Sequence, residues 1–165
     1  MPELPEVETI VRGLRPTLPG KTIERLRILH ADVLRQSRRE FSARLKGRTF
    51  ESVDRRGKNI VAHLTEGVVL VVNLGMTGRL VWARDETPTT HPAVRFTVNA
   101  GPALVYDDVR RFGRLEAMNE TEWAMRDRDL GPEPLSSTFT AQRPLEVLSR
   151  SVSPIRYPAL VPQPR

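Results

Sequence analysis

Hydrophobic positions near the start of the chain recur with the period of a helix. Val7, Ile10, Val11 and Leu14 stand at i, i+3, i+4 and i+7, so they form one apolar stripe. Pro16 interrupts the pattern, because proline removes a backbone donor and its ring clashes with the preceding turn. The pattern predicts an N-terminal helix with one buried face.

A second, shorter helix is expected over residues 38–46. Ser37 and Glu40 have the spacing of a capping box, in which the two residues satisfy free backbone N–H groups at a helix start. Phe41 and Leu45 lie four residues apart and would share the buried face. Farther along, Asn119 and the acidic residue three positions later could cap another short helix that ends near residue 126.

Most of the chain between these helices favours strands, with turns that contain glycine between them. The predicted strands cover residues 22–34, 49–54, 60–64, 68–74, 79–83, 94–99, 103–106 and 113–118. Residues 85–92, with two prolines and three threonines, are expected to form a loop. Several short strands at close spacing indicate a β-sandwich or a barrel-like core with flanking helices, which is an α+β fold that is mainly β.

Composition adds a charge pattern to this picture. The 165 residues carry a formal net charge of +6, and residues 21–60 alone hold 12 Lys or Arg against 5 Asp or Glu. A basic region of this kind is often only a well-solvated surface. Because the whole basic excess is regional, we interpret it as a face that binds phosphates, with nucleic acid as the first candidate partner and an anionic membrane surface as the second.

Several classes of protein are excluded. The chain has no cysteine, which rules out disulfides, thiol nucleophiles and zinc sites built on cysteine, and three scattered histidines do not replace them. No apolar run approaches the roughly 18 residues that a membrane span needs. We therefore expect a soluble cytoplasmic protein without a metal site, a cofactor or a membrane partner.

The N-terminus carries the residues with the clearest chemistry. Removal of Met1 would leave Pro2 with a free secondary amine, and an α-amino group with a pKa near 8 is partly unprotonated at neutral pH. Such an amine can attack a sugar C1′ and form an iminium, with Glu3 and Glu6 as nearby proton donors. The alternative is an ordinary helix start, where proline and acidic residues are favoured in any case. Composition does not decide between them.

Five segments, in order, resemble motifs of the formamidopyrimidine glycosylase and endonuclease VIII family, in its formamidopyrimidine-DNA glycosylase branch. They resemble its opening, catalytic-lysine loop, wedge loop, opposite-strand loop and entry to the helix-two-turn-helix domain. The segments are Met1 to Thr9 (MPELPEVET), Arg56 to Asn59 (RGKN), Asn73 to Gly78 (NLGMTG), Asp108 to Gly113 (DVRRFG) and Leu130 to Leu135 (LGPEPL). One motif alone would be weak, but five in family order are specific.

The resemblance implies a two-layer β-sandwich and a bifunctional DNA glycosylase and abasic-site lyase that removes oxidised purines, such as 8-oxoguanine and formamidopyrimidines, in base excision repair. Pro2 would be the nucleophile, Glu3 the general acid at the sugar and Glu6 a supporting carboxylate. Lys58 would hold a phosphate beside the lesion. The partner would be damaged double-stranded DNA, and the protein a monomer that works at the bacterial nucleoid.

The other matched positions imply DNA contacts. An enzyme that extrudes a nucleotide leaves a gap that apolar side chains fill. By resemblance Met76 enters this gap, Phe112 wedges beside the estranged base and Arg110 bonds to that base, while Arg111 is either structural or a phosphate contact. Asn73 stands where many family members carry histidine, which keeps a polar contact but loses the ionisable ring. Without the motifs, Met76 and Phe112 would be interpreted as core residues.

The resemblance fails at the end of the chain. It runs to about residue 156, and the proline-rich stretch 157–165 does not match. We expect a catalytic domain over 1–129, an incomplete helix-two-turn-helix region over 130–156 and an irregular tail over 157–165. The family's phosphate-gripping Gly-Asn-Ile-Tyr segment and its zinc ribbon are missing from such a truncated form.

Two other functions stay open. The chain could be a basic β-sandwich that binds DNA weakly without chemistry, such as an impaired fragment or a gene remnant. It could also be an unrelated basic nucleic-acid-binding protein, for example one associated with the ribosome, although five ordered motifs argue against this.

Overall fold

The computed structural model describes residues 4–84 and 88–133. The chain divides between Leu130 and Gly131 into two units, and the helices and strands described belong to the first. Pro2 and Glu3 lie outside the described residues. So do the tail predicted over 157–165 and nearly all of the region predicted over 130–156.

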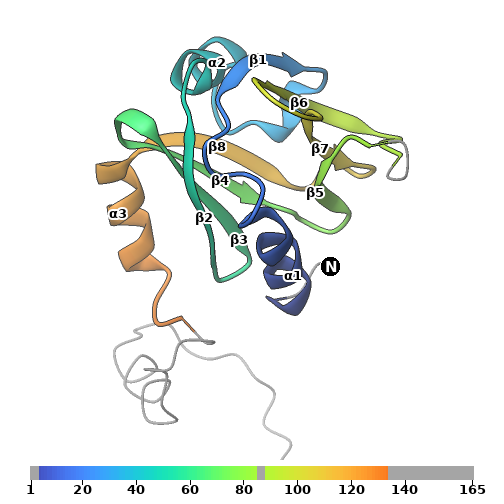
Figure 1. The fold of residues 1–165 in the computed structure, drawn as a ribbon. Helices are drawn as coiled ribbons and strands as arrows, with labels where there is room; N and C mark the ends of the chain where they lie inside the picture. The colour runs from blue at the N-terminus through green and yellow to red at the C-terminus, as the bar shows by residue number, and fades with distance from the viewer. Residues whose placement is uncertain (1–3, 85–87, 134–165) are drawn as a thin grey trace, which may run out of the picture. The chain divides into compact units, whose positions relative to one another are not determined.

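Eight strands form two four-stranded antiparallel sheets, in the orders β1-β6-β7-β5 and β2-β3-β4-β8 (Figure 1). The strands are β1 (Ile23–Ile28), β2 (Phe50–Arg56), β3 (Asn59–Leu64), β4 (Val68–Asn73), β5 (Gly78–Trp82), β6 (Pro92–Val98), β7 (Leu104–Asp108) and β8 (Arg114–Asn119). The helices are α1 (Leu4–Leu14), α2 (Arg38–Leu45) and α3 (Glu120–Asp129), with short 3₁₀ turns η1 (Ala31–Val33) and η2 (Thr65–Gly67). The predicted two-layer sandwich is confirmed.

One predicted strand is too long. The run 22–34 was expected to be extended throughout, but β1 ends at Ile28 and a 3₁₀ turn follows at Ala31–Val33. Alanine and aspartate, which occupy positions 31 and 32, are both depleted in strands. The chain then turns towards the other sheet, where Leu34 forms an isolated parallel bridge with Leu115. This turn is what brings Asp32 next to the β7–β8 loop.

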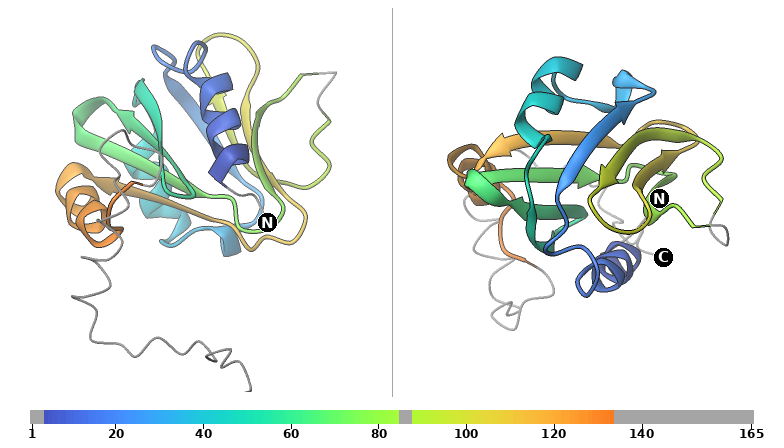
Figure 2. Two further views of the ribbon diagram at one scale, coloured as in Figure 1. Left: turned by 90° about the horizontal axis from the view of Figure 1, so that it is seen from below. Right: turned by 45° about the horizontal axis from the view of Figure 1, so that its top comes forward.

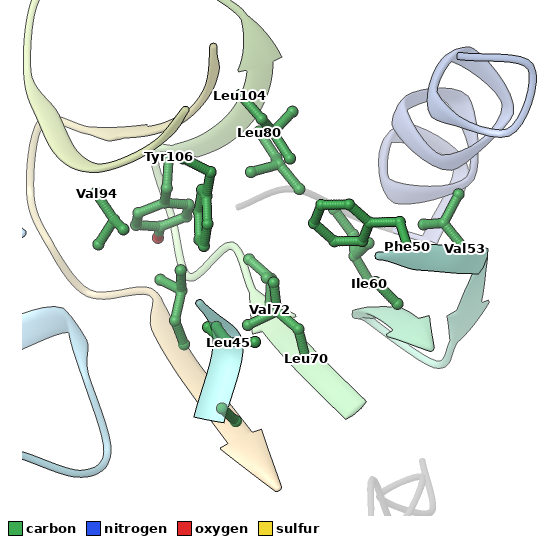
Figure 3. Close-up of a cluster of buried hydrophobic side chains, with 14 of the residues drawn as sticks. Leu45, Phe50, Val53, Ile60, Leu70, Val72, Leu80, Val94, Leu104 and Tyr106 are labelled. Carbon is green, nitrogen blue, oxygen red and sulfur yellow. The ribbon is translucent and has the colours of Figure 1, made fainter. Parts of the chain in front are cut away.

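The core lies between the two sheets, and it contains apolar side chains from both (Figure 3). Along β3, Ile60, Ala62 and Leu64 belong to this core, whereas the alternate residue Val61 belongs to a separate cluster. This alternation is the period of two that a strand with two different faces requires. Tyr106 is the largest fully buried side chain of the core.

Helix α1 lies beside the sandwich, between β2 of one sheet and β5 of the other (Figure 2). Its residues Val7, Val11 and Leu14 are buried in the core, and Ile10 packs against it. The predicted apolar stripe is therefore confirmed. The helix begins at Leu4, directly after the two residues expected to carry the sugar chemistry.

The other two helices have the predicted caps. The hydroxyl of Ser37 accepts a hydrogen bond from the backbone N–H of Glu40 at 3.1 Å. Asn119 and Glu122 form a complete capping box, and α3 extends three residues beyond the expected end. Its Trp123 packs on the outer face of the second sheet, against a small cluster formed by Val61, Val69, Val71 and Met118. No helix in the described part of the chain is long and apolar enough to span a membrane.

Candidate functional site

Four polar residues form a continuous row across one end of the sheet β2-β3-β4-β8. Arg56 pairs with Asn59, Asn59 with Asn73, and Asn73 with Arg114, each on the neighbouring strand. Three matched motifs meet at this row: RGKN begins and ends in it, NLGMTG begins at Asn73, and DVRRFG ends directly before Arg114. The sheet register therefore places the motifs at one edge.

Lys58 lies at the tip of the β2–β3 hairpin. The turn has only two residues, and Gly57 takes a φ of 59°, a conformation that glycine adopts without strain. The side chain of Lys58 is exposed. The carbonyl oxygen of Gly57 accepts a hydrogen bond from the guanidinium of Arg55 at 2.9 Å, which fixes the turn from below. The hairpin thus presents an ammonium group on a braced backbone.

The same Arg55 ties the hairpin to helix α1. Its Nε lies 2.9 Å from Oε2 of Glu8, and its side chain is only 5% exposed. The hydrogen bond from Arg55 is the main cause that lowers the pKa of Glu8, against the opposing effect of burial and with help from Arg12 and Arg15. This ion pair fixes the helix that follows Pro2 and Glu3 against the strand that leads to Lys58.

Asn73 ends β4 and makes its hydrogen bonds inside the protein. Its Nδ2 donates to Oδ1 of Asn59 at 3.1 Å, and its Oδ1 accepts from the backbone N–H of Gly75 at 3.0 Å. The carboxamide therefore shapes the turn that follows it, as asparagine side chains commonly do two residues ahead. One of its amide hydrogens is sufficient for Asn59, so the second can serve a phosphate.

Met76 is at the tip of the β4–β5 loop, and the residue is 38% exposed. The loop is narrow because glycine stands on both sides of it. A Cβ at Gly75 would lie 2.5 Å from the backbone nitrogen of Gly113, and a Cβ at Gly78 would overlap the carbonyl oxygen of Leu74. Gly75 thus lets this loop approach the backbone of residues 112–113, and Gly78 lets it close tightly on itself and on Tyr106.

The β7–β8 loop presents Arg110 and Phe112 to solvent. Phe112 is 52% exposed as a residue, and the guanidinium carbon of Arg110 lies 4.6 Å from the centroid of its ring. A cation over an aromatic face is a favourable contact that orients both groups. Both residues were expected at a DNA interface, and the fold leaves them outside the core. Val109, at the start of the same loop, is also exposed.

Arg111 points its charge to a different partner. Its Nε donates to Oδ2 of Asp32, in the 3₁₀ turn after β1, at 2.8 Å. This hydrogen bond is the main cause that lowers the pKa of Asp32. Arg111 also has a φ of 52°, which is unusual for a residue with a side chain. Of the two roles expected for it, these contacts favour the structural one.

Glu6 lies in the first turn of α1, where its side chain is exposed. The described part of the chain thus contains seven of the nine predicted site residues. Met76, Arg110 and Phe112 lie on two loops in contact, and Asn73 ends the strand that leads into the first of them. Lys58 directly precedes Asn59 of the polar row, and Arg111 is turned towards Asp32.

The basic region 21–60 is less open than its composition indicates. Several of its arginines form ion pairs with carboxylates of the same chain. These are Arg35 with Glu116, Arg44 with Glu40 and Glu122, Arg48 with Glu66, Arg55 with Glu8, and Arg56 with Asp127. Five of the twelve basic residues of this region therefore link elements of the fold, and the phosphate-binding face stays a prediction for the others.

A polar cavity of about 370 Å³ opens beside the row, on the outer face of the second sheet. Asn59, Asn73 and Phe112 line it together with Arg114. Val71, Arg35, Glu116 and Arg126 complete its lining. Three guanidinium groups against one carboxylate make the cavity electropositive, which suits a phosphate group.

Asp108 and Thr77 belong to the site but had no role in the sequence interpretation. The carboxylate of Asp108 is buried, with 1% exposure, and accepts hydrogen bonds from the hydroxyls of Thr77 (2.6 Å) and Tyr106 (2.8 Å). The sequence feature that could have indicated this role is the acidic pair Asp107–Asp108 directly after an apolar strand. A carboxylate buried there needs hydrogen-bond partners. The strand was expected to end at Tyr106, which hid this signal.

Among the described residues, no group of three or more His, Cys, Asp or Glu side chains comes together that could hold a metal ion. The whole sequence lacks cysteine, so a cysteine-ligated zinc ribbon does not fit this chain.

Residues 1–115 match the family model described as the formamidopyrimidine-DNA glycosylase N-terminal domain. The formamidopyrimidine-DNA glycosylase of Moorella thermoacetica is 44% identical over 160 residues, which cover 94% of this chain and 58% of the relative. That of Desulforamulus reducens is 39% identical over 147 residues, with 86% and 53% covered. The chain spans little more than half the length of these relatives.

Solved structures give the same result. The wild-type Lactococcus lactis Fpg (MutM), in a complex with DNA that contains N7-benzyl-Fapy-dG, matches with a TM-score of 0.79 and 28% identity, over 90% of this chain and 56% of that one. The Lactococcus lactis protein bound to DNA that contains FAPY-dG matches with a TM-score of 0.77 and 27% identity, over 90% and 57%.

Proposed function

The chain belongs to the formamidopyrimidine-DNA glycosylase family, and from this membership we propose that it carries out base excision on damaged double-stranded DNA. The substrates would be oxidised purines such as 8-oxoguanine and formamidopyrimidines. The observation that carries the proposal is the meeting of three matched motifs, those of Lys58, Met76 and Phe112, at one edge of a sheet.

The chemistry assigned to Pro2 and Glu3 follows from the amine. The nitrogen of Pro2 attacks C1′ of the damaged nucleotide, the bond from C1′ to the base breaks, and the base leaves with a proton. The departing base takes up the proton that the amine loses. Glu3 then protonates the sugar ring oxygen, the bond from C1′ to that oxygen breaks, and the nitrogen lone pair forms the C=N bond of an iminium. The iminium then accepts the electron pair left when a proton leaves C2′, and the bond to the 3′ phosphate breaks by elimination.

The edge supplies what this chemistry needs. Met76 and Phe112 are exposed apolar side chains on adjacent loops, suited to fill the space that an extruded nucleotide leaves. Arg110, held over Phe112, offers donors to the base that has lost its partner. Lys58 and the free amide hydrogen of Asn73 would hold the phosphates that flank the lesion.

Borohydride trapping tests the proposal. The 165-residue chain with a free Pro2 is mixed at low salt with duplex DNA that contains an abasic site, and borohydride reduces any iminium to a stable protein–DNA adduct. We expect an adduct that is lost when residues are added ahead of Pro2 and is much reduced in Pro2→Gly. A Lys58→Gln variant should trap less, and its affinity for DNA should depend less steeply on salt.

The absence of an adduct from a folded sample would overturn the proposal. Salt-sensitive DNA binding without an adduct would instead identify the chain as a basic DNA-binding module. Such a module would bind DNA equally well with residues added ahead of Pro2. Light scattering of the same sample would check the expected monomer.

A further inference from the structure

A single buried carboxylate joins the two loops that carry the exposed apolar residues. Asp108 ends β7, and its oxygens accept hydrogen bonds from the hydroxyl of Thr77 (2.6 Å), the hydroxyl of Tyr106 (2.8 Å) and the backbone N–H of Gly113 (3.0 Å). Thr77 belongs to the β4–β5 loop and Gly113 to the β7–β8 loop, so one side chain holds parts of both.

Thr77 extends this link to the other side. While its hydroxyl donates to Asp108, the same oxygen accepts a hydrogen bond from the backbone N–H of Arg110 at 3.1 Å. The hydrogen bonds therefore run from the backbone of Arg110 to the hydroxyl of Thr77, which directly follows Met76, and from there to the carboxylate of Asp108. The direct contact between Gly75 and the 112–113 backbone closes the arrangement.

The neighbouring residue shows that burial alone does not produce this arrangement. Asp107 is equally buried, but its partners are the side chain of Arg79 and the backbone N–H of His91. These partners lie on β5 and directly before β6, so the bonds of Asp107 link strands within a single sheet. Asp108 has its partners on the two loops that leave the sandwich.

Burial raises the pKa of Asp108, but hydrogen bonds from Thr77, Tyr106 and the backbone of Gly113 and Arg111 outweigh this effect and leave the pKa below its ordinary value. The group is therefore charged at neutral pH. A charged acceptor makes each of these hydrogen bonds stronger than one between neutral groups.

We propose that Asp108 is a positioning residue that acts through Thr77 to make the β4–β5 and β7–β8 loops one rigid unit, so that Met76 and Phe112 enter the DNA duplex together. The rigid unit stands on the contacts above, and its role on DNA rests on the proposed function. A pair of wedges fixed in advance loses less conformational freedom on binding than two independent loops.

The first test uses the full chain without DNA. Asp108→Asn removes a buried charge and could prevent folding, so the main variant is Thr77→Val, which has nearly the same shape without the hydroxyl. Hydrogen exchange of the Arg110 and Gly113 amides should accelerate roughly fivefold or more in Thr77→Val, since the link through Asp108 is lost. Thr77→Ser keeps the hydroxyl and should restore the exchange rates.

Thr17→Val is the matched control. It removes a hydrogen bond from Trp82 of β5 to the turn that follows α1, and Thr17 makes no hydrogen bond with either loop among the described residues. Exchange in residues 109–113 should stay at the parent level in this control. Unchanged exchange there in Thr77→Val, or failure of Thr77→Ser to restore it, would overturn the proposal.

The second test measures wedge insertion on DNA. A 2-aminopurine placed opposite an abasic-site analogue becomes brighter when it is unstacked. Thr77→Val should reduce this signal at least about twofold at saturating protein, and it should lower the affinity for DNA less than Lys58→Gln does, because the affinity depends mainly on phosphate contacts. Met76→Ala and Phe112→Ala should have non-additive effects on the signal in the parent chain and additive effects in Thr77→Val.

The two tests separate the two hypotheses. If the parent chain neither binds DNA nor is trapped, the proposed function is wrong, and hydrogen exchange still decides whether Asp108 joins the loops. If the parent binds DNA, and if the parent and Thr77→Val brighten the 2-aminopurine equally, the proposed function stands and the joint insertion of Met76 and Phe112 is wrong.

Discussion

The interior of the sandwich and its loop-bearing edge are held together in different ways. Between the sheets, contacts are almost entirely apolar and come from many residues, such as Phe41, Phe50 and Phe96. At the edge, the two loops depend on one carboxylate, Asp108, and on backbones in close contact at Gly75. Apolar contacts are non-directional, so they tolerate compensation, whereas hydrogen bonds and glycine contacts require particular atoms at particular places.

The difference explains where apolar residues are found outside the core. Met76 and Phe112 are exposed because they lie on loops outside the sandwich, where glycines allow a tight backbone. Loops in which hydrogen-bonded polar groups and glycines hold apolar side chains in solvent are typical of a binding surface.

The largest expected contrast compares two phenylalanines. Phe41→Ala should lower the free energy of unfolding by about 3–5 kcal/mol, because Phe41 is fully buried and its removal leaves a cavity. Phe112→Ala should change it by less than about 0.5 kcal/mol, as surface substitutions usually do. Urea denaturation measures both, and a large loss in Phe112→Ala would show that this ring belongs to the core.

Two glycines should respond to alanine with opposite signs. In Gly113→Ala the new Cβ would overlap the hydroxyl of Tyr106 and the carbonyl oxygen of Asn73, so we expect a loss of about 2–3 kcal/mol. In Gly13→Ala, within α1, nothing lies within 4 Å of the new Cβ, and the helix should gain up to about 1 kcal/mol. Thermal unfolding of both variants checks the signs, and a neutral Gly113→Ala would mean that a side chain has room beside Tyr106 and Asn73.

The charge of Asp108 should make the edge sensitive to pH. Because its pKa is lower in the folded protein than the value near 4 of an unfolded chain, its contribution is fully present above that value and is lost as the pH falls through the folded pKa. At neutral pH, Asp108→Asn should cost about 1–3 kcal/mol.

The parent and the Asp108→Asn variant should therefore become more alike in stability as the pH falls below about 4. Urea unfolding at several pH values measures this, with Asp54→Asn, an exposed carboxylate on β2, as the control. A difference that stays constant from pH 7 to pH 3 would contradict the prediction.

A smaller loss than that of Asp108→Asn is expected at the surface ion pair that holds the β7–β8 loop. Asp32→Asn weakens the ion pair with Arg111, but both side chains are about half exposed, so the free energy of unfolding should fall by less than about 1 kcal/mol. Unfolding in low and high salt measures this effect, which salt should reduce further. A loss as large as that of Asp108→Asn would show that Arg111, and not the buried carboxylate, is the main support of the loop.

Local sequence patterns are sufficient to predict helices, their caps and the positions of strands, because a few neighbouring side chains determine each of these features. The stripe that begins at Val7, the cap at Ser37 and the capping box at Asn119 were all predicted, and the eight strands were each located within a few residues. The exception is the run after Ile28, where a 3₁₀ turn replaces the strand because the chain crosses to the other sheet.

The sequence by itself determined the helices, the strands and the motif residues, because periodicity, caps and turn residues act over a few neighbouring positions. Only the tertiary structure decided which strands are neighbours, that Arg55 braces α1 and not a phosphate, that Arg111 turns to Asp32, and that Asp108 joins two loops. The partners in these three contacts lie 31 to 79 positions apart in the sequence. No local pattern specifies them, since they depend on how two sheets of different strand order pack against each other.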